Sequence, residues 1–213
     1  MTTMKTTQIT KLKKDYDTKG TIMIPFKKYP NPFSKDDFNK LKIYCENVDK
    51  EFISIGDAGE KNHLLVGRFM TDKEKPEIVK NKFSKKVISI LEKKNIQNFI
   101  KKILNVKGKI YYRRIQFNQI EKNCFVGYHL DTDSNPDYVA ACVIQLGSKF
   151  DGGIYRVYNK KDNNKFYDYP PTEGSLIISD CNYPHEVTKV TGGKRCSLVF
   201  FVSRDNGLNK RYV

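Results

Sequence analysis

Apolar residues in the first half of the chain recur mainly at helical spacing. Ser34 can cap a first helix, with Asp37 as its capping-box partner three residues on. The apolar face that follows consists of Phe38, Leu41, Cys45 and Val48. A second helix is predicted to begin at Pro76, because proline is favoured in a first helical turn, and to run to about residue 90. The same spacing predicts a third helix over residues 96–104.

Beyond residue 109 the pattern changes to short β-rich runs, a type that also occurs earlier at 52–55 and 64–66. The later runs cover residues 109–119, 124–131, 138–147, 153–159, 165–169, 175–180, 185–190 and 195–203. Turn signals such as Asp151-Gly-Gly153 and Gly192-Gly193 separate them. About eight strands at such regular spacing predict a jelly-roll sandwich or barrel.

The expected fold class is therefore α+β. A jelly-roll core should span about residues 109–203, and helices from about residues 34–105 should pack on one face of it. Residues 1–20 are polar and rich in lysine, so we expect a flexible basic arm there, followed by a single domain over residues 21–213. With 213 residues, of which 38 % are hydrophobic, the chain is large enough to bury one core.

Composition points to an intracellular protein. Apolar runs such as residues 198–202 are far shorter than the roughly 20 residues that a membrane helix needs. The N-terminal segment has no apolar core of a secretion signal. Five cysteines without a C-x-x-C pair argue against a disulfide framework and against a cysteine-type zinc site. We therefore expect a soluble, cytoplasmic protein with reduced thiols.

The formal net charge of +15 raises the question of a nucleic-acid partner. From Lys80 to Lys109 the chain carries ten lysines and a single acid, Glu92, and such a stretch can follow a phosphate backbone. Only seven of the 39 basic residues are arginine, the side chain that reads bases and phosphates through two parallel hydrogen bonds. The sequence therefore favours a solvated helical face over a nucleic-acid track.

Three residues suggest a metal site. His129 and Asp131 are two positions apart, so in a strand their side chains share one face, and His185 can return beside them in a barrel. Two imidazoles and one carboxylate form the facial triad of non-haem Fe(II) oxygenases, which leaves further coordination positions open. The alternative is a surface pair plus a histidine in a turn.

The residues after His185 favour the metal site. Arg195 and Ser197 alternate in a predicted strand, and both can face the interior that holds His185. A buried arginine with a hydroxyl on the same face is suited to binding a carboxylate. His63, the third histidine of the chain, precedes an apolar run and is expected to pack at a strand edge.

These motifs resemble the Fe(II)/2-oxoglutarate-dependent dioxygenase superfamily, and within it the prolyl-4-hydroxylase-like branch. The segment Tyr128-His-Leu-Asp131 looks like that family's first metal motif, and Asp151-Gly-Gly-Ile-Tyr155 looks like its D-G-G stretch. Residues 185–195 are similar to its H-E-V-x-x-V-x-x-G-x-R stretch. The resemblance covers about residues 109–203 and implies a double-stranded β-helix core.

The resemblance implies a reaction and its metal. His129, Asp131 and His185 would hold Fe(II) and carry catalysis, and 2-oxoglutarate and O₂ would be co-substrates, with ascorbate as a supporting reductant. The reaction would hydroxylate a substrate C–H with release of succinate and CO₂.

The resemblance also implies how the co-substrate is held. Arg195 would pair with the distal carboxylate of 2-oxoglutarate, and Ser197 would assist. Asn118 and Gln145 lie where strands of such folds supply further contacts, although solvent-facing strand amides are the alternative. Many prolyl-hydroxylase-like members use a tyrosine for such a contact, and no tyrosine of this chain matches that position clearly.

Three substrate classes remain open at the level of sequence. A peptide or protein side chain, prolyl or lysyl, is the default for this branch and is favoured here, with no membrane partner. A nucleobase is the second class, because residues 143–153 also look somewhat like the thymine and methylcytosine oxidases of the superfamily. A free amino acid or another small metabolite is the third. A basic β-sandwich that only binds is disfavoured, because the three ligands and Arg195 are all present.

Overall fold

The structure is a computed structural model that describes residues 2–26 and 31–212. Its helices are α1 (Thr2–Lys19), α2 (Lys35–Glu46), α3 (Ser84–Leu91) and α4 (Lys94–Ile103), with single 3₁₀ turns at Asp131–Asp133 and Lys210–Tyr212. The strands are β1 (Thr21–Ile24), β2 (Glu51–Ile55), β3 (Lys61–Asp72), β4 (Pro76–Ile78), β5 (Tyr111–Ile120), β6 (Val126–His129), β7 (Tyr138–Gln145), β8 (Phe150–Gly152), β9 (Tyr155–Asn159), β10 (Asp162–Tyr169), β11 (Leu176–Asp180), β12 (His185–Val187), β13 (Val190–Gly193) and β14 (Arg195–Ser203).

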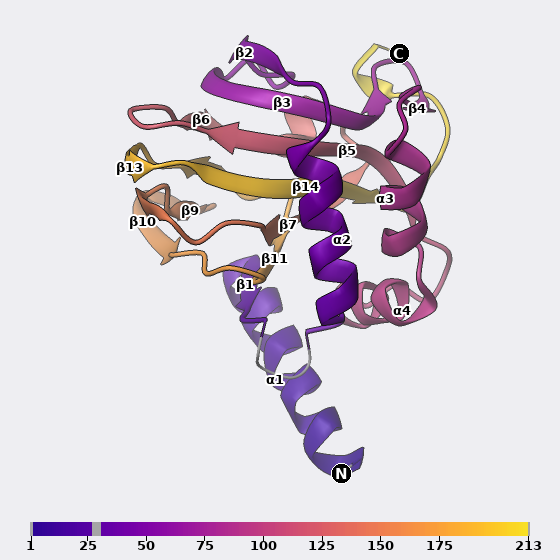
Figure 1. Ribbon diagram of the computed structural model, residues 1–213. Coiled ribbons are helices and arrows are strands. Elements are labelled where there is room, and N and C mark those ends of the chain that lie inside the picture. The colour runs from indigo at the N-terminus through magenta and orange to yellow at the C-terminus, as the bar shows by residue number, and fades with distance from the viewer. Residues whose placement is uncertain (1, 27–30, 213) are drawn as a thin grey trace.

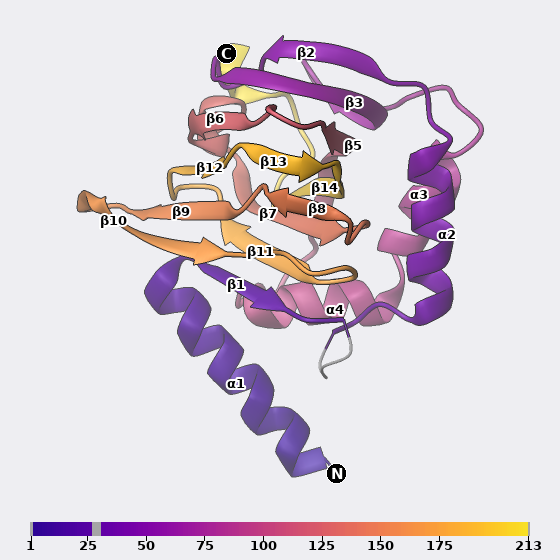
Figure 2. The same cartoon turned by 60° about the vertical axis from the view of Figure 1, so that its left-hand side comes forward.

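One long antiparallel sheet curls into a nearly closed barrel. Its strand order is β1-β11-β7-β14-β5-β3-β6-β12-β9-β10, with β2 and β4 paired to β3. We call the six strands from β1 to β3 the major wall and the four from β6 to β10 the minor wall (Figures 1 and 2). The walls meet where Asn62 of β3 pairs with Val126 of β6. This is the double-stranded β-helix of the jelly-roll class, as the strand pattern predicted.

Helices cover the outer face of the major wall, as Figure 2 shows for α2, α3 and α4. The alternation of side chains along β5 explains this arrangement: Ile115 and Phe117 join the core beneath the helices, whereas Arg114, Gln116 and Asn118 line the barrel interior. Strands β3, β5, β7 and β14 of the major wall therefore each contribute one face to the core beneath the helices and the other to a cavity. The predicted placement of the helices on one face is confirmed.

Helix α2 begins as its sequence predicts. The Ser34 hydroxyl accepts a hydrogen bond from the backbone N–H of Asp37 at 3.1 Å and donates one to the Asp37 carboxylate at 2.8 Å. Lys93 adds an ion pair to Asp37 at 2.5 Å, and the Asp37 side chain is only 5 % exposed. The cap therefore also connects α2 to the segment before α4.

Two segments differ from the expectations. Residues 2–19 form helix α1, where a flexible arm was expected, and Ile9, Leu12 and Tyr16 pack from this helix against the core. Pro76 begins strand β4 on the edge of β3 instead of a helix. Helix α3 starts at Ser84, where the Asn81 carboxamide oxygen accepts hydrogen bonds from two backbone N–H groups. The start of α3 is thus determined by Asn81 just before the helix, and not by Pro76.

The glycine pairs predicted as turns take part in strand pairing. Gly152 and Gly193 lie in β8 and β13, which form a separate two-stranded sheet. Both have positive φ, +70° and +65°, so the backbone bends sharply while it pairs. This small sheet lies next to the start of β14 and therefore close to Arg195.

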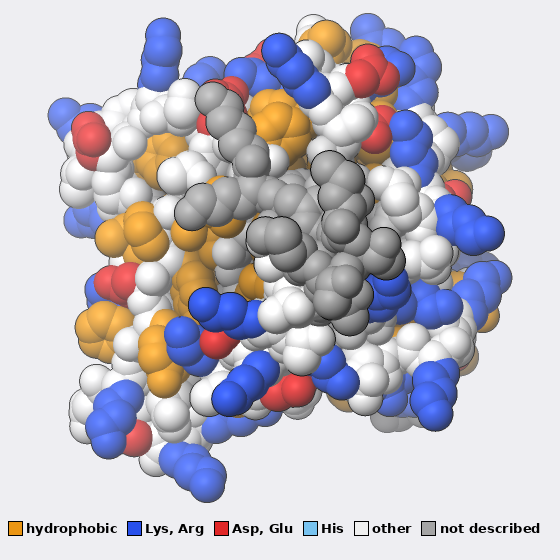
Figure 3. Space-filling model, turned by 90° about the horizontal axis from the view of Figure 1, so that it is seen from below, with side chains coloured by type: hydrophobic (Ala, Val, Ile, Leu, Met, Phe, Trp, Pro, Cys, Tyr) orange, Lys and Arg blue, Asp and Glu red, His pale blue; other side chains and the backbone are white. Residues whose placement is uncertain are grey.

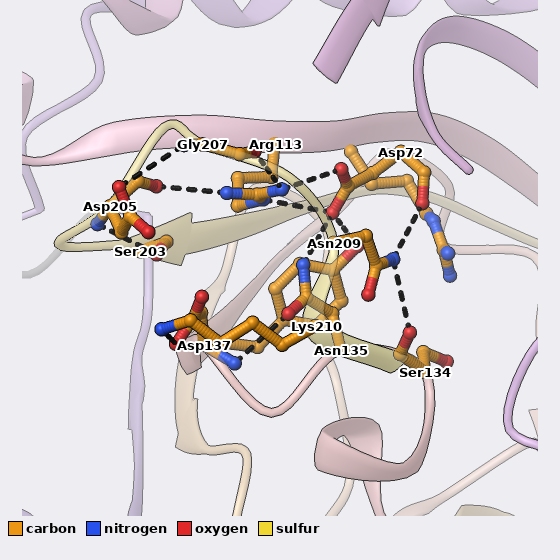
Figure 4. Close-up of polar contacts among 12 residues, drawn as sticks. Asp72, Arg113, Ser134, Asn135, Asp137, Ser203, Asp205, Gly207, Asn209 and Lys210 are labelled. Atoms are coloured by element: carbon orange, nitrogen blue, oxygen red, sulfur yellow. Dashed lines mark hydrogen bonds and ion pairs between the residues drawn. The ribbon is translucent and has the colours of Figure 1, made fainter. Parts of the chain in front are cut away.

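A buried ion pair between Arg113 and Asp72 stabilises one end of the barrel (Figure 4). Arg113 donates from Nε and Nη2 to the Asp72 carboxylate, both at 2.9 Å, and both side chains are fully buried. Asp72 also accepts hydrogen bonds from Asn135 and Tyr138 at 2.9 Å each. Asn209 adds a bond from the C-terminal segment to the Asp72 carbonyl. The network joins β3, β5, the segment before β7 and the C-terminus.

None of the helices over residues 2–26 and 31–212 has the length and apolar character needed to cross a bilayer.

Candidate functional site

Three side chains meet inside the barrel, on the minor wall. His129 ends β6, His185 begins β12 opposite it in register, and Asp131 stands in the 3₁₀ turn that follows β6. Asp131 Oδ1 lies 3.3 Å from His129 Nε2, and Asp131 Oδ2 lies 3.6 Å from His185 Nε2. The predicted strand over 124–131 is shorter than expected, so Asp131 reaches the site from a turn and not by strand alternation. All three potential ligand atoms lie within 4.8 Å of one another.

Backbone carbonyls orient both imidazoles. His129 Nδ1 lies 2.8 Å from the Gly127 carbonyl oxygen, and His185 Nδ1 lies 3.1 Å from that of Tyr183. When each Nδ1–H donates to its carbonyl, both Nε2 atoms present lone pairs to the shared centre. Two imidazole nitrogens and a carboxylate with a buried Oδ2 that lacks a hydrogen-bond partner fit a divalent transition metal such as Fe(II).

Electrostatics keep the carboxylate of the cluster ionised. Burial raises the pKa of Asp131, but the neighbouring His185 and His129 outweigh burial and hold this pKa below its usual range. Burial works against a charged His129, yet the hydrogen bond and charge of Asp131 raise the pKa of His129 to about 9. For His185, burial dominates and lowers the pKa to about 4. The centre therefore carries an anionic oxygen, as a cation site requires.

Arg195 is a buried cation that has no counter-ion within residues 2–26 and 31–212. Its side chain is 2 % exposed, and its Nε and Nη2 have no hydrogen-bond partner among the described residues. The Ser197 hydroxyl on the same strand face is also buried without a partner. Burial lowers the pKa of Arg195 to about 10, so the guanidinium stays charged at neutral pH. Buried, unpartnered donors of this kind are costly unless a ligand pairs with them, and they fit a carboxylate.

Asn118 and Gln145 flank Ser197 in the sheet. Ser197 of β14 is in register with Asn118 of β5 on one side and with Gln145 of β7 on the other. Asn118 lines the cavity and accepts a hydrogen bond from Gln116 Nε2 at 2.9 Å. Gln145 is not among the cavity-lining residues, but its Oε1 is buried without a partner. The two amides thus stand beside the predicted carboxylate site, with Asn118 the more accessible from the cavity.

Sequence reasoning missed Tyr155, which begins β9 behind the D-G-G stretch. The Tyr155 ring lies 5.2 Å from the ring of His185, and the buried Tyr155 hydroxyl has no hydrogen-bond partner in the described part of the chain. Gly153, two residues earlier, leaves room for Arg195: a Cβ at Gly153 would stand 2.9 Å from Arg195 Cδ. The D-G-G glycine is therefore a close-approach position, and the alternation Gly153, Tyr155 was the available signal.

The cavity that holds these groups opens to solvent at its mouth. Both walls line it, and besides the groups above it contains Arg68 and Arg114 of the major wall and Asp57 from the turn between β2 and β3. Arg114 was also not singled out from the sequence, although it alternates with Gln116 and Asn118 on β5.

His63 does not join the cluster. It lies on the exposed face of β3, between the cavity-lining residues Asn62 and Leu64. Its Nδ1 is 3.0 Å from the Cys124 sulfur, and Phe52 packs edge-on against its ring at 4.9 Å. This histidine is therefore separate from the metal-ligating set.

Comparisons with known proteins agree with this chemistry. Residues 115–203 match the model of the 2OG-Fe(II) oxygenase superfamily. A 2OG-Fe(II) oxygenase family oxidoreductase from Burkholderia pseudomallei is 29 % identical with a TM-score of 0.85, over 95 % of this chain and 93 % of that one. The search of curated protein sequences returns no match.

Two prolyl hydroxylases share the fold at lower identity. A prolyl-4-hydroxylase from Pseudomonas putida is 17 % identical with a TM-score of 0.63, over 92 % of this chain and 99 % of that one. A prolyl hydroxylase from Trichoplax adhaerens, solved with a peptide fragment of hypoxia inducible factor, is 14 % identical with a TM-score of 0.63, over 94 % and 91 %. Residues 115–203 therefore carry a 2OG-Fe(II) oxygenase domain, and the chain is an oxidoreductase that works with Fe(II), 2-oxoglutarate and O₂.

Proposed function

We propose that this oxygenase hydroxylates a C–H bond of its substrate while 2-oxoglutarate and O₂ are converted to succinate and CO₂. The observation that carries the proposal is one buried cavity with two unmet requirements: an Asp131 oxygen without a partner beside two imidazoles, and Arg195 without a counter-ion. When bound by His129, Asp131 and His185, Fe(II) would supply the oxidising chemistry with O₂.

The chain's own residues would position the reactants. Arg195 and Ser197 would hold the distal carboxylate of 2-oxoglutarate through charge-assisted hydrogen bonds, which fixes the opposite end of the molecule toward the histidines. Asn118 and Gln145 would add amide contacts from the neighbouring strands. The apolar lining, including Val143 and Val199, would exclude water from the reacting groups.

For the substrate, we propose a peptide or protein side chain of the prolyl or lysyl type. The fold shared with prolyl hydroxylases supports this class, including the Trichoplax protein solved with a peptide. Asp57 of the β2–β3 turn lines the cavity and is 45 % exposed, so the cavity reaches the surface there and a substrate side chain could enter while its backbone stays outside.

A nucleobase is the less favoured substrate. The lysine-rich region forms α3 and α4 with the segments around them, and these helices lie on the outer face of the major wall, across the sheet from the cavity. Figure 3 shows lysines and arginines around the whole outline of the face seen there, with acidic side chains between them. A nucleic-acid strand bound to α3 and α4 would thus not place its bases in the cavity.

The proposal is tested by Fe(II)-dependent conversion of 2-oxoglutarate to succinate. We expect the wild-type protein to form succinate, and His185→Ala to lose both Fe(II) binding and turnover while its fold persists. His63→Ala is the matched control, because His63 stands outside the cavity, and it should keep both properties. Normal turnover by His185→Ala would refute the assignment of the three ligands.

A further inference from the structure

Two neighbouring arginines on β5 are both buried but have opposite surroundings. Arg113 has a counter-ion and further acceptors: besides Asp72 it donates to the carbonyl oxygens of Asp205 and Gly207. Arg114 points to the other face of the strand and lines the cavity, with a side chain only 9 % exposed. The fold therefore explains why Arg113 is buried, but it does not explain why Arg114 is.

Arg114 has one ionic partner. Its Nη1 lies 2.9 Å from Asp57 Oδ2, and no hydrogen bond joins its other N–H groups to any part of the described chain. The guanidinium is held by the rings of Phe201 and Tyr138, whose centroids lie 5.5 and 5.8 Å from its central carbon. A guanidinium offers five N–H donors, so a fixed, buried one with a single partner has donors left for a ligand in the cavity.

The Asp57 carboxylate can leave its ion pair with Arg114 without disturbing the fold. It lies in the turn between β2 and β3, and its side chain is 45 % exposed. The Asp57 backbone is held separately, because Arg211 donates a hydrogen bond to its carbonyl oxygen. Rotation of the carboxylate into solvent therefore suffices to uncover Arg114. Arg68, with its Nη1 4.0 Å from Asp57, stands beside the same position.

Arg114 and Arg195 mark different parts of the cavity. Arg195 begins β14, whereas Phe201, against which Arg114 packs, lies six residues further along that strand. At about 3.3 Å per residue these strand positions are roughly 20 Å apart. A co-substrate bound at Arg195 thus leaves Arg114 available for a second anion.

We propose that Arg114, with Arg68 beside it, is a receptor for a carboxylate of the substrate, which displaces Asp57 on binding. This inference rests on the proposed function, because it assigns a property to the substrate of that site. A carboxylate is favoured over a phosphate because Asp57 already places a carboxylate oxygen at 2.9 Å from the guanidinium. The group can come from the α-carboxylate of a free amino acid or from an acidic side chain of a peptide.

The receptor can be tested without turnover, by saturation-transfer NMR on protein loaded with Zn(II) and saturating 2-oxoglutarate. The probes are benzoate and its uncharged isostere benzamide. We expect Asp57→Asn to bind benzoate about tenfold more tightly than the wild type, and Arg114→Gln to bind it about tenfold more weakly. Arg156→Gln is the matched control, since Arg156 pairs with Asp168 on β10, outside the cavity, and it should behave as the wild type.

Three results would overturn the proposal: no benzoate binding to Asp57→Asn, equal binding of benzoate to Asp57→Asn and the wild type, or equal binding of benzamide and benzoate. The Asp57→Asn comparison stands even if Arg114→Gln does not fold, because Asp57 lies on an exposed turn.

A turnover experiment distinguishes the two sources. Succinate formation with Fe(II) is compared for L-proline and L-lysine against their amides, and for end-blocked proline or lysine peptides carrying Glu against the same peptides carrying Gln. Preference for the acid in the first series indicates a free amino acid, and in the second an acidic peptide. Equal stimulation by acid and amide in both series would overturn the proposal. Loss of succinate under all conditions would count against the proposed function, and benzoate binding would still decide the receptor.

Discussion

At the scale of single residues, the partners of a buried arginine distinguish a structural role from a functional one in this protein. Arg113 is buried and paired with a buried carboxylate, which is what a structural cation requires, whereas two nitrogens of the buried Arg195 have no partner among the described residues. The fold tolerates such an unpaired cation only where a ligand supplies the missing charge. The location of Arg195 in the cavity that holds the histidine cluster fits this reading.

Substitution of Arg195 by leucine should weaken binding of 2-oxoglutarate and leave metal binding intact. The variant removes a charge-assisted pair with a desolvated carboxylate, a loss of about 2 kcal/mol or more, which corresponds to at least about a 30-fold rise in Kd. Calorimetric titration of Zn(II)-loaded protein with 2-oxoglutarate measures the effect. Unchanged affinity would mean that another residue anchors the co-substrate.

Only some of the site residues could be predicted from the sequence. His129, Asp131, His185 and Arg195 could be identified because their spacing follows a motif. Strand alternation alone hints at Tyr155 and Arg114, but their importance also depends on what stands opposite them in the barrel. That information comes from the pairing of distant strands, which a single sequence does not contain.

At the scale of elements, the Asp72 network determines how the end of the barrel is closed (Figure 4). We expect Asp72→Asn to lower the free energy of unfolding by about 3–5 kcal/mol, because Arg113 would remain buried without its counter-charge. Denaturant unfolding measures the change. Asp168→Asn, which breaks a surface pair with Arg156, should cost less than about 1 kcal/mol. A similar loss in both variants would contradict the role assigned to the network.

The cap of α2 should make stability depend on acid pH. Burial raises the pKa of Asp37, but hydrogen bonds from Lys93 and Ser34 outweigh it and hold this pKa below the ordinary 3.8. A lowered folded-state pKa stabilises the fold above pH 3.8, and this contribution is lost as the pH falls through the folded-state pKa. The difference in unfolding free energy between wild type and Asp37→Asn should therefore be constant near neutral pH and shrink below about pH 4. A difference that stays constant in acid would refute this account.

Elements could be predicted where local signals agree with tertiary packing. The α2 cap and the β-rich second half follow their patterns closely. Helix α1 was missed because its apolar residues, Ile9, Leu12 and Tyr16, are few among many polar ones, and the surface they pack against lies elsewhere in the chain. Pro76 was misread because proline suits an edge strand as well as a first helical turn.

At the scale of the whole molecule, the major wall separates two surfaces. Its inner face lines the cavity, and its outer face is covered by helices whose exposed sides carry lysines. The candidate active site and the lysine-rich helices thus lie on opposite sides of one sheet. This separation favours the view that the lysines of α3 and α4 solvate the surface and do not guide a nucleic acid into the cavity.

A charge-reversal experiment tests this separation. Replacing Lys85, Lys86, Lys94 and Lys102 with glutamate lowers the net charge from +15 to +7, because each substitution removes two units. Lys93 is spared, since it pairs with the buried Asp37 and its loss would disturb α2.

We expect succinate formation on the true substrate to change by less than about twofold, because charges across the sheet are screened beyond a Debye length of about 8 Å. The matched control replaces Lys73, Lys75, Lys122 and Lys161, exposed lysines away from these helices, and reaches the same net charge. If the helices instead follow a phosphate backbone, the first variant alone loses salt-sensitive DNA or RNA binding. Detection of an oxidised nucleobase with the wild type, lost in the first variant and kept in the control, would reverse the ranking of substrates.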